Sequence, residues 1–549
     1  MMSLLPLSSC TPATFNLSGI SGLEILHLDA ALVTNFSASV PAALRYTQPG
    51  VELSNATFCN ITVSYTHPGQ NDNIYAEAWL PTDNWNSRLQ AVGGGGFAAG
   101  RFYLSYEAMA GALADGYATI TTDAGLGDAI EPSPWALLSV GNVNLYNLQN
   151  LGSASLADGA FIAKSLIKSF YGKGPDFSYW NGCSQGGRQG LMLAQRYPTL
   201  YDGIAAGAPA IHWNRLTASI QWPQQFMSIL GSYPYGCEID AINAAAISAC
   251  DGLDGIVDGI IAEVDTCLAT FDPFQLVGRS INCTEAGGAI PIGTTAAAVI
   301  NATWNGVFTA SGKQTWYGLN PGADIASIGE VSSGVAATNC TSGICVGVPQ
   351  FLSDPWFRLF VAKDPDFNLY NITHAQFDSL VHRSQQLYES LLDTDDPDLS
   401  DFRSAGGKLL SFHGLADEII PAKGTTHYYD AIASGIPEID DFYRHFEVPG
   451  LGHCYGGPSG VPTNLFSQLR AWVENGTAPT QTSVQVTDLE GEVHNRTLRR
   501  YLHKPRGKGQ QCGSGKTEVT NPWTVLTSFP RRSLSILSHI LKWSKLAVA

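Results

Sequence analysis

Apolar and polar residues follow two different periods along the chain from about residue 74 onward. Short runs rich in β-branched and aromatic residues predict strands at 74–80, 89–92, 117–122 and 177–180. Between them, residues 157–171 carry apolar side chains three and four positions apart, which is the spacing of a helix with one buried face. Strands that alternate with helices form a largely parallel sheet, so the pattern predicts an α/β fold.

This alternation stops after about residue 209 and resumes with a compact apolar strand at 408–412. The stretch between holds six of the eleven cysteines and many small residues, without a regular order of strands and helices. A chain of 549 residues is also too long for one compact core. We therefore expect an α/β core at 1–210 and 401–500, and a large inserted lid domain at 211–400.

The sequence Gly-Cys-Ser-Gln-Gly at 182–186 follows a predicted strand and precedes a helical stretch, 188–197. A tight turn between a strand and a helix exposes the hydroxyl of the central serine, and flanking glycines let the backbone pass without a clash. The context favours Ser184 as a nucleophile over a glycine-rich turn without function. The backbone N–H of Gln185 would then point toward the negative oxygen that develops in the reaction.

A serine nucleophile needs a base and an acid that orients it, and in α/β-hydrolases the order along the chain is Ser, Asp, His. Asp417 lies in the loop after the strand 408–412, where the orienting acid belongs. Its neighbour Glu418 is the weaker candidate because it begins the next element. His413 is too close to the acid in sequence to be the base, and we expect it to pack in the loop.

A later strand, 442–448, runs into the glycine-rich loop Pro-Gly-Leu-Gly-His at 449–453. We expect His453 to be the general base, which takes the serine proton and returns it to the leaving alcohol. His445 lies inside the strand and is the weaker candidate.

Four consecutive glycines at 93–96 follow the strand 89–92. The loop lacks the Lys and the Ser or Thr of a phosphate-binding P-loop. It is closer to the glycine-rich loop that completes the oxyanion hole of esterases, so Gly95 and Gly96 are expected to contribute to it.

Two cysteines flank the expected site, since Cys183 precedes Ser184 and Cys454 follows His453. If the serine and the histidine are within hydrogen-bond reach, their neighbours are close enough to bridge. The sequence therefore predicts a Cys183–Cys454 disulfide that joins nucleophile and base.

Composition and charge narrow the class of protein. The net charge of −17 argues against a nucleic-acid partner, whose binding needs clustered Lys and Arg, and no apolar run is long enough to span a membrane. Many cysteines and glycosylation sequons favour a secreted protein. Residues 1–10 are too short and too interrupted for a signal peptide, so we expect that a leader is missing from this sequence. The sequons begin at Asn16, Asn35, Asn55, Asn60, Asn282, Asn301, Asn339, Asn371, Asn475 and Asn495.

An acidic segment at 250–260 lies inside the expected lid. Its three aspartates, separated by glycines, can supply oxygen ligands to a hard cation, although the spacing is not that of an EF-hand. From these residues alone, an acidic surface turn remains the alternative.

The arrangement Cys183-Ser184, Asp417 and His453-Cys454 resembles the CS-D-HC pattern of the fungal tannase and feruloyl esterase family, with a likeness from about Cys10 to Asn495. The resemblance implies an α/β-hydrolase core with a lid, the catalytic roles named above, a bond between the two cysteines, and phenolic-acid esters as substrates. It also implies a structural Ca²⁺ in the lid, with ligands from Asp251, Asp254 and Asp258 and the carbonyls of Ile256 and Ile260.

The likeness weakens beyond about residue 498, where a basic tail at 501–549 ends in an amphipathic segment, 534–543. Related enzymes usually carry a cysteine pair in this region, so an altered reading frame or splice site would explain why Cys512 lacks a partner; a membrane-surface helix is the alternative. The pairing of several cysteines stays open, whereas disulfides are also expected at Cys10, Cys59, Cys250 and Cys267.

We therefore expect a secreted serine esterase that cleaves small or polysaccharide-linked phenolic esters through an acyl-enzyme. Feruloyl esterase is the first expectation and tannase, a galloyl ester hydrolase, is the alternative. A non-catalytic binding protein is disfavoured because no member of the triad is missing. A serine peptidase on the same fold would be distinguished by turnover of a peptide amide.

Overall fold

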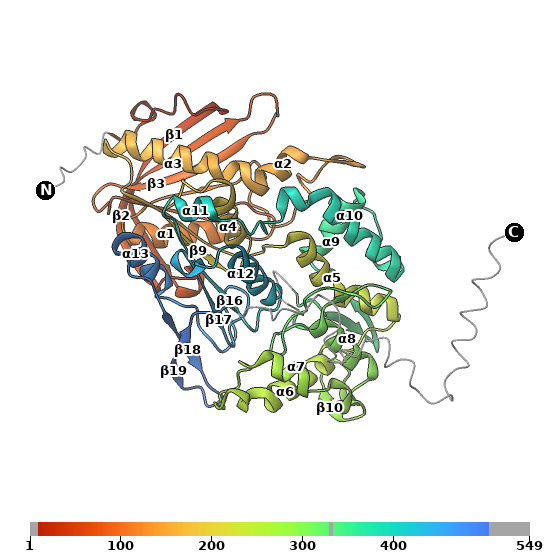
Figure 1. Cartoon of the computed structure of the whole chain (residues 1–549). Helices are drawn as coiled ribbons and strands as arrows, with labels where there is room; N and C mark the ends of the chain where they lie inside the picture. The colour runs from red at the N-terminus through yellow and green to blue at the C-terminus, as the bar shows by residue number, and fades with distance from the viewer. Residues whose placement is uncertain (1–8, 329–332, 504–549) are drawn as a thin grey trace.

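The computed structural model describes residues 9–328 and 333–503 (Figure 1). Nine strands within these ranges form one sheet: β1 Glu24–Val40, β2 Val51–Thr66, β3 Ile74–Pro81, β4 Arg88–Val92, β5 Ala118–Thr122, β8 Phe177–Cys183, β9 Gly203–Gly207, β16 Lys408–Gly414 and β17 Tyr443–Val448. Their order is β1-β2-β3-β5-β4-β8-β9-β16-β17. From β5 to β17 neighbouring strands run parallel, whereas β1, β2, β3 and β5 pair antiparallel.

Helices cover both faces of this sheet. On one face lie α3 Ser155–Tyr171, α4 Gln185–Arg196 and α12 Lys423–Gly435, and on the other lie α1 Tyr103–Ala114 and α13 Leu465–Asn475. The apolar residues of each helix form common buried clusters with the strands. The expected α/β-hydrolase core is therefore confirmed, with the carboxyl ends of β8, β16 and β17 at one edge of the sheet.

The strands and helices predicted for the core correspond to β3, β4, β5, β8, β16, β17, α3 and α4. The two long strands β1 and β2 were not predicted. Their pairing has register shifts between Ile25 and His27, between Val33 and Phe36, and between Phe36 and Ala38. Such bulges interrupt the two-residue period by which a strand is recognised in sequence.

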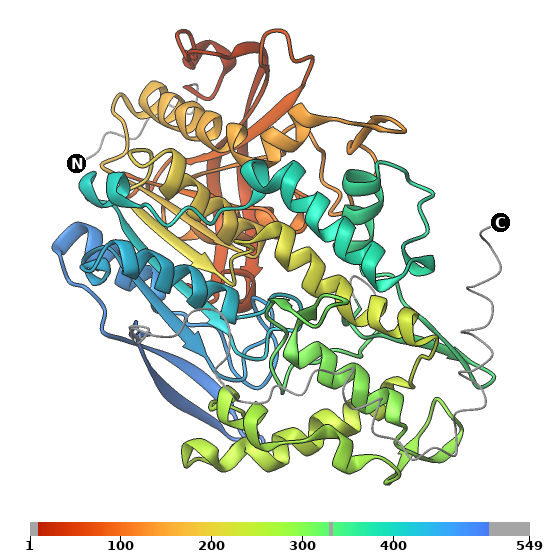
Figure 2. The same cartoon turned by 45° about the vertical axis from the view of Figure 1, so that its right-hand side comes forward.

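The chain between β9 and β16, here called the inserted segment, lies to one side of the sheet (Figure 2). Its buried apolar side chains form one core. That core also takes in Phe97 and Ile419, which flank the site described below. Its first helix, α5 Trp213–Leu230, is buried on nearly all sides and contains the buried Gln221, Gln224 and Gln225, so no amphipathic period marks it. Its other α-helices are α6 Gly236–Cys250, α7 Val264–Thr270, α8 Thr294–Asn305, α9 Ser353–Pro355, α10 His374–Leu392 and α11 Ser400–Ser404. The segment also contains three hairpins, β10 Ser280–Cys283 with β11 Gly288–Pro291, β12 Val307–Phe308 with β13 Gln314–Trp316, and β14 Thr338–Thr341 with β15 Ile344–Gly347.

Smaller elements complete the chain. A short hairpin, β6 Leu137–Ser139 with β7 Asn142–Val143, precedes α2 Leu145–Gln149, and a longer hairpin, β18 Gln481–Thr487 with β19 Val493–Arg499, follows α13. The predicted basic tail at 501–549 lies outside the described residues from 504 onward, together with Cys512. Residues 1–8 also lie outside them.

Candidate active site

Ser184 lies at the carboxyl end of β8, at the point where the chain turns into α4. Its backbone has φ 61° and ψ −122°, a left-handed conformation that is rare for a residue with a side chain. The turn is tight, because a Cβ added at Gly182 would lie 2.6 Å from the backbone of Gly186. The N–H of Ser184 donates to the carbonyl of Gly207 at the end of β9 (3.0 Å), which fixes the turn to the sheet.

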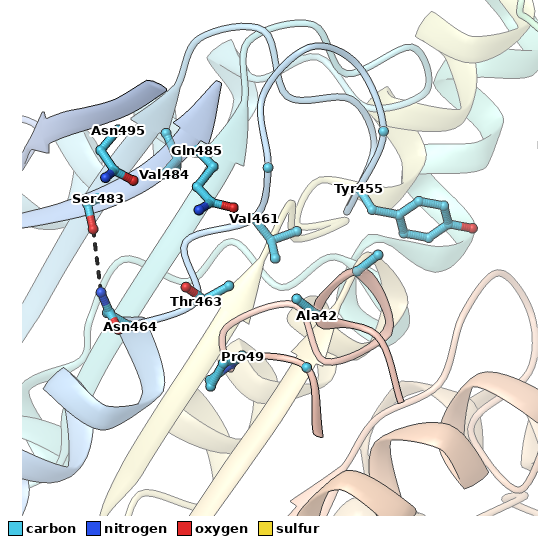
Figure 3. A pocket seen from close by; sticks show the side chains of 14 residues that line it. Ala42, Pro49, Tyr455, Val461, Thr463, Asn464, Ser483, Val484, Gln485 and Asn495 are labelled. Carbon is cyan, nitrogen blue, oxygen red and sulfur yellow. Dashed lines mark hydrogen bonds between the residues drawn. The ribbon is translucent and has the colours of Figure 1, made fainter. Parts of the chain in front are cut away.

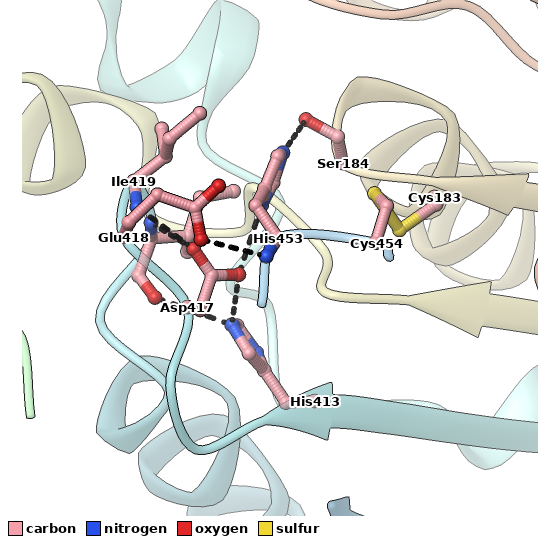
Figure 4. The surroundings of a disulfide bond; sticks show 9 residues. Cys183, Ser184, His413, Asp417, Glu418, Ile419, His453 and Cys454 are labelled. Atoms are coloured by element: carbon pink, nitrogen blue, oxygen red, sulfur yellow. Dashed lines mark hydrogen bonds and ion pairs between the residues drawn. A yellow bond between two sulfur atoms is a disulfide. The ribbon is translucent and has the colours of Figure 1, made fainter. Parts of the chain in front are cut away.

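Three side chains from three strand ends form one hydrogen-bonded chain (Figure 4). Ser184 Oγ lies 2.9 Å from His453 Nε2, and His453 Nδ1 lies 2.8 Å from Asp417 Oδ2. Because Asp417 accepts the Nδ1–H proton, Nε2 is free to accept the hydroxyl proton of the serine. The sequence predicted all three residues, and the structure brings them together.

The carboxylate of Asp417 is buried and fully hydrogen-bonded. Its Oδ1 accepts the backbone N–H groups of Ile419 (2.9 Å) and Ile420 (2.7 Å), and its Oδ2 also accepts from His413 Nε2 (3.1 Å). Burial alone would raise the pKa of Asp417, but the charge of His453 and the hydrogen bonds from both histidines hold it well below its ordinary value. Asp417 is therefore ionised and can stabilise an imidazolium at His453.

The contact between Asp417 and His453 also shifts the pKa of the histidine, in the opposite direction. Burial alone would lower the pKa of His453, but the charge and hydrogen bond of Asp417, with the charge of Glu418, raise it above its ordinary value. His445, the rejected alternative, is buried in β17 beside Ser411, and burial lowers its pKa to about 3. His445 is therefore a neutral core residue.

Two neighbours of the triad have roles that sequence reasoning missed. His413 was expected in the loop, but it is buried within β16, where Nδ1 accepts from Thr425 Oγ1 (2.7 Å) and Nε2 contacts Asp417. Glu418 Oε2 accepts the backbone N–H of His453 (2.9 Å), so it positions the loop that carries the base. Burial raises the pKa of Glu418, as does the charge of Asp417. The available signals were the four-residue spacing from His413 to Asp417 and the adjacent acids.

The predicted disulfide between Cys183 and Cys454 is present beside the hydrogen-bonded Ser184, His453 and Asp417 (Figure 4). It joins the residue before the serine to the residue after the histidine across 271 positions of sequence. Cys454 itself has φ 64°, so the turn after His453 is held in a conformation that few residues adopt. The other disulfides pair Cys10 with Cys59, Cys237 with Cys283, Cys250 with Cys267, and Cys340 with Cys345.

The expected oxyanion hole needs one correction. Among the described residues, the backbone N–H groups of Gln185 and Gly96 have no hydrogen-bond acceptor, so both remain available as donors. The N–H of Gly95 instead donates to the carbonyl of Ala98 (3.1 Å) within the glycine-rich loop. Gly95 therefore shapes the loop, and Gln185 and Gly96 are the donors that fit an oxyanion hole.

A pocket of about 290 Å³ opens over Ser184 and His453. The inserted segment contributes Phe351 and Leu352 to its wall, and the core contributes apolar and aromatic side chains. Those core residues include Tyr46, Phe102, Tyr103, Leu104, Ile130, Ile419 and Tyr455. The wall is largely aromatic and aliphatic, and Ser184, Glu418 and His453 supply polar groups.

The acidic loop expected to bind calcium has oxygen donors that suit a hard cation. Among the described residues, the carbonyls of Ile256 and Ile260 accept no backbone hydrogen bond, and Asp258 Oδ1 is buried without a partner. The Asp251 carboxylate accepts the N–H groups of Asp258 (3.0 Å) and Ile260 (3.2 Å), which folds the loop around it. These oxygens are of the type that Ca²⁺ binds. The carboxylates of Asp251, Asp254 and Asp258 do not lie within 4.8 Å of one another as a set, so the loop would have to close around the ion.

One residue that was not considered in the sequence also contacts this loop. The guanidinium of Arg496, on β19, pairs with Asp254 (2.6 Å) and Asp258 (3.5 Å). Arg496 therefore links the β18–β19 hairpin to the inserted segment, and its positive charge lies beside two of the three carboxylates of the loop.

No helix among residues 9–328 and 333–503 combines the length and the apolar character that crossing a membrane requires.

Comparison with known proteins gives a consistent result. The family model described as tannase and feruloyl esterase matches residues 59–518. A probable feruloyl esterase of Arthroderma benhamiae is 38% identical over 462 residues, which cover 82% of this chain and 83% of that protein. A tannase of Aspergillus oryzae is 28% identical over 93% of this chain and 92% of its own length.

Among solved structures, the tannin acyl hydrolase from Aspergillus niger superposes with a TM-score of 0.81 at 28% identity, over 91% of this chain and 92% of that one. The resemblance seen in the Cys-Ser, Asp and His-Cys residues is thus confirmed across most of the sequence. The chain belongs to the tannase and feruloyl esterase family of carboxylic ester hydrolases.

Proposed function

We propose that this protein is a serine esterase that cleaves esters of phenolic acids, with feruloyl esters as the preferred substrates. The observation that carries the proposal is the hydrogen-bonded chain from Ser184 through His453 to Asp417, at the base of an apolar pocket. Feruloyl esters are placed first because the 38% identical relative is named a probable feruloyl esterase. Galloyl esters are the second candidate, since the 28% identical relative is named a tannase.

In the proposed mechanism, Ser184 Oγ attacks the ester carbonyl while His453 Nε2 takes the proton of the Ser184 hydroxyl. The N–H groups of Gln185 and Gly96 bind the oxyanion, and Asp417 stabilises the imidazolium. His453 then gives the proton to the leaving alcohol, and an acyl-enzyme remains on Ser184. Water, activated by the same histidine, attacks the acyl-enzyme and releases the acid.

The region 211–400 acts as a lid in this proposal. Phe351 and Leu352 lie in the pocket wall and belong to this region, so it helps to enclose the acyl group.

We further propose a structural Ca²⁺ held by Asp251, Asp254, Asp258 and the carbonyls of Ile256 and Ile260. When bound, the ion would fix the conformation of this loop and take no part in the reaction.

Secretion and N-glycosylation are part of the same proposal. Five disulfides among the described residues suit an oxidising compartment. The sequon asparagines are at least partly exposed, except Asn301, which is 9% exposed within α8 and is inaccessible to modification once folded.

Turnover of methyl ferulate, methyl p-coumarate and methyl gallate, compared in parallel, tests the function and orders the acids. Ser184→Ala should lose on the order of a million-fold in kcat while keeping the melting temperature of the wild type. Residual turnover of all three esters by this variant would refute the assignment of the nucleophile. A higher kcat/KM for the gallate ester would favour the tannase activity.

A further inference from the structure

We propose that Ca²⁺ binds at the place where the inserted segment returns to the core. The site is formed by the carboxylates of Glu389, near the end of α10, and of Asp393 and Asp395, in the connection from α10 to α11 (Figure 1). It is distinct from the acidic loop at 250–260 and does not depend on the esterase reaction proposed above. The ion would hold together the two ends of the inserted segment.

The inserted segment leaves the core and returns to it at one place, here called the joint. The joint consists of two stretches that are bonded to each other, residues 211–214 at the start of α5 and residues 392–396 at the end of α10. The N–H of Thr394 donates to the carbonyl of Ile211 (2.8 Å). Asp393 Oδ1 accepts both the backbone N–H and the side-chain amide of Asn214 (2.9 and 2.8 Å). A ligand that fixes the second stretch therefore also restrains the first.

The three carboxylates are close enough to share one ion. One oxygen of each of Glu389, Asp393 and Asp395 lies within 4.8 Å of the other two. Oxygens at these separations can contact one ion at distances close to the roughly 2.3–2.6 Å of Ca²⁺ coordination. Mg²⁺ needs shorter contacts in a strict octahedron, so the set favours Ca²⁺. Water can complete the coordination, because Glu389 is exposed.

The buried carboxylate of Asp393 is an independent sign of a ligand. Asp393 is only 5% exposed, and it lines a pocket of about 400 Å³ together with Glu389 and Asp395. Its Oδ1 is occupied by Asn214, whereas its Oδ2 is buried and has no hydrogen-bond partner among the described residues. A buried carboxylate oxygen without a partner costs free energy, and a cation beside it removes this cost.

The positive side chains around the pocket do not neutralise these acids. The guanidinium of Arg196 lines the pocket, but it donates to a serine hydroxyl and to a backbone carbonyl (3.2 and 2.7 Å). Arg215 comes only to 4.0 Å from Glu389. Within the described part of the chain, no lysine or arginine nitrogen lies within 4.0 Å of the carboxylate of Asp393 or Asp395, and the latter contacts only a histidine.

This acidic lining is not a general property of the pockets, although the net charge of the chain is −17. No charged side chain lines the larger pocket, of about 520 Å³, beside the β18–β19 hairpin (Figure 3). The catalytic pocket contains one carboxylate, that of Glu418, whose Oε2 accepts the N–H of His453. Of these three pockets, the one at the joint is the one that gathers several carboxylates.

The joint also contacts the helix that follows the nucleophile. The carbonyl of Thr394 accepts from Gln195 Nε2 (2.7 Å), and its hydroxyl accepts from Arg188 Nη1 (3.2 Å), both on α4. Thr394 stands between Asp393 and Asp395, so an ion on these two acids would restrain the residue that attaches the inserted segment to α4.

The test counts the Ca²⁺ ions that each chain binds. Chelator-treated protein is dialysed to equilibrium in physiological salt at about 2 mM free Ca²⁺, above the roughly 0.1–1 mM dissociation constants of extracellular sites. Glu389→Gln/Asp393→Asn, the joint variant, should bind one ion fewer than the wild type. Asp398→Asn is the matched control, because this exposed acid lies in the same connection but outside the set, and it should bind as many ions as the wild type.

A variant of the acidic loop separates the two calcium proposals. Asp258→Asn should lose any ion bound at 250–260 and keep the ion at the joint. If the acidic loop binds no Ca²⁺, the wild type should bind one ion and the joint variant none. Hydrogen exchange locates the ion directly, because Ca²⁺ should slow exchange of the Thr394 amide about tenfold in the wild type and leave it unchanged in the joint variant.

Equal ion counts for the joint variant and the wild type would overturn the proposal, as would exchange of the Thr394 amide that Ca²⁺ does not slow. A loss in Asp398→Asn equal to that in the joint variant would show unspecific binding to surface acids and would overturn it too. If the joint variant does not fold, Glu389→Gln alone decides. This exposed substitution should weaken Ca²⁺ binding about tenfold by removing one charged ligand, and an unchanged affinity would refute the site.

Discussion

Asp417 accepts hydrogen bonds from two histidines and two backbone amides, so neither of its oxygens has a lone pair left for water. The backbone amides of Ile419 and Ile420 donate to Oδ1. His413 and His453 both donate to Oδ2. Because the acid is fixed from three sides, its orientation sets that of the base. The tautomer of His453, with its proton on Nδ1, follows directly from this contact.

Replacing Asp417 by Asn should lower kcat/KM on the order of 10⁴-fold, because the amide favours the wrong tautomer of the histidine. It should also move the acid limb of the pH–rate profile to lower pH. The reason is that the charge of Asp417 raises the pKa of His453, so removing it lets the base lose its proton at lower pH. The profile of kcat/KM between pH 4 and 9 is the measurement. An acid limb that stays in place would mean that His453 is not the group that titrates.

Some residues of the site could be located and given a role from the sequence, and others could not. Ser184, Asp417 and His453 could be located because each stands at the end of a recognisable strand in the required order. The roles of His413 and Glu418 could not be assigned in this way. Their spacing from Asp417 places them near the triad, but the atoms that they contact depend on the fold. Gly95 was assigned wrongly for a related reason, since a bond of its N–H within a four-glycine loop depends on the fold of that loop.

At the scale of elements, the site is assembled from the ends of β8, β16 and β17. β8 and β16 are buried except at their first residue, and β17 is buried except at Arg444 and Glu447. Their aromatic and aliphatic residues and their clear ends allowed the strands to be predicted. The bulged β1 and β2 could not, and neither could α5, whose burial on all sides removes the helical period. The strands around the site could thus be predicted from the sequence, whereas the antiparallel edge of the sheet and the interior of the inserted segment could not.

The Cys183–Cys454 bond ties the turn after β8 to the loop after β17. Loops are mobile unless fixed, so the double variant Cys183→Ala/Cys454→Ala should lose catalytic geometry more than substrate binding. We expect kcat to fall about a hundredfold, the effect of misplacing catalytic groups by about 1 Å, with a smaller change in KM. The free energy of unfolding should fall by about 2–5 kcal/mol. Steady-state kinetics and denaturant unfolding measure the two effects, and an unchanged kcat would show that the bond does not position the base.

A second contact between elements predicts a dependence of stability on pH. Glu474 on α13 receives Nε and Nη2 of Arg88 on β4 (2.7 and 2.6 Å) and the hydroxyl of Tyr179 (2.7 Å). The hydrogen bonds from Arg88 are the main cause that lowers the pKa of Glu474 to about 2 from its ordinary 4.5. A carboxyl whose folded pKa is depressed stabilises the protein above its unfolded pKa, and the stabilisation disappears as pH falls through the folded value.

Glu474→Gln should therefore have a lower melting temperature than the wild type at pH 6, and the difference should shrink as the pH falls from 4.5 toward 2. Thermal unfolding of both proteins at several pH values measures this. Glu492→Gln, at an exposed acid of the β18–β19 hairpin, is the control. A difference that is constant with pH would mean that Glu474 contributes by packing and not by its charge.

At the scale of the whole molecule, the inserted segment meets the core at the catalytic pocket and again at the acidic loop. Arg496 reaches from β19 to Asp254 and Asp258 in that loop. A cation bound there would stabilise the contact between the two parts of the chain.

Removal of divalent ions should lower the melting temperature, because an ion that binds only the folded protein stabilises it by mass action. We expect added Ca²⁺ to restore the original melting curve. Arg496→Gln is the informative comparison, because the loop would then depend on the ion alone and the chelator should have a larger effect. An unchanged melting curve in chelator, together with a lower melting temperature of Arg496→Gln, would mean that the arginine replaces the cation.

The disulfide between Cys183 and Cys454 encloses the entire inserted segment in one covalent ring, because one cysteine precedes β9 and the other follows β17. A protease that cuts the chain anywhere between β9 and β16 opens this ring without releasing either half. The cleaved protein would run as one species on a gel without reductant and as two species after reduction. Nicked molecules therefore keep nucleophile and base in a single covalent unit, and loss of activity after proteolysis would require either reduction or damage to the pocket itself.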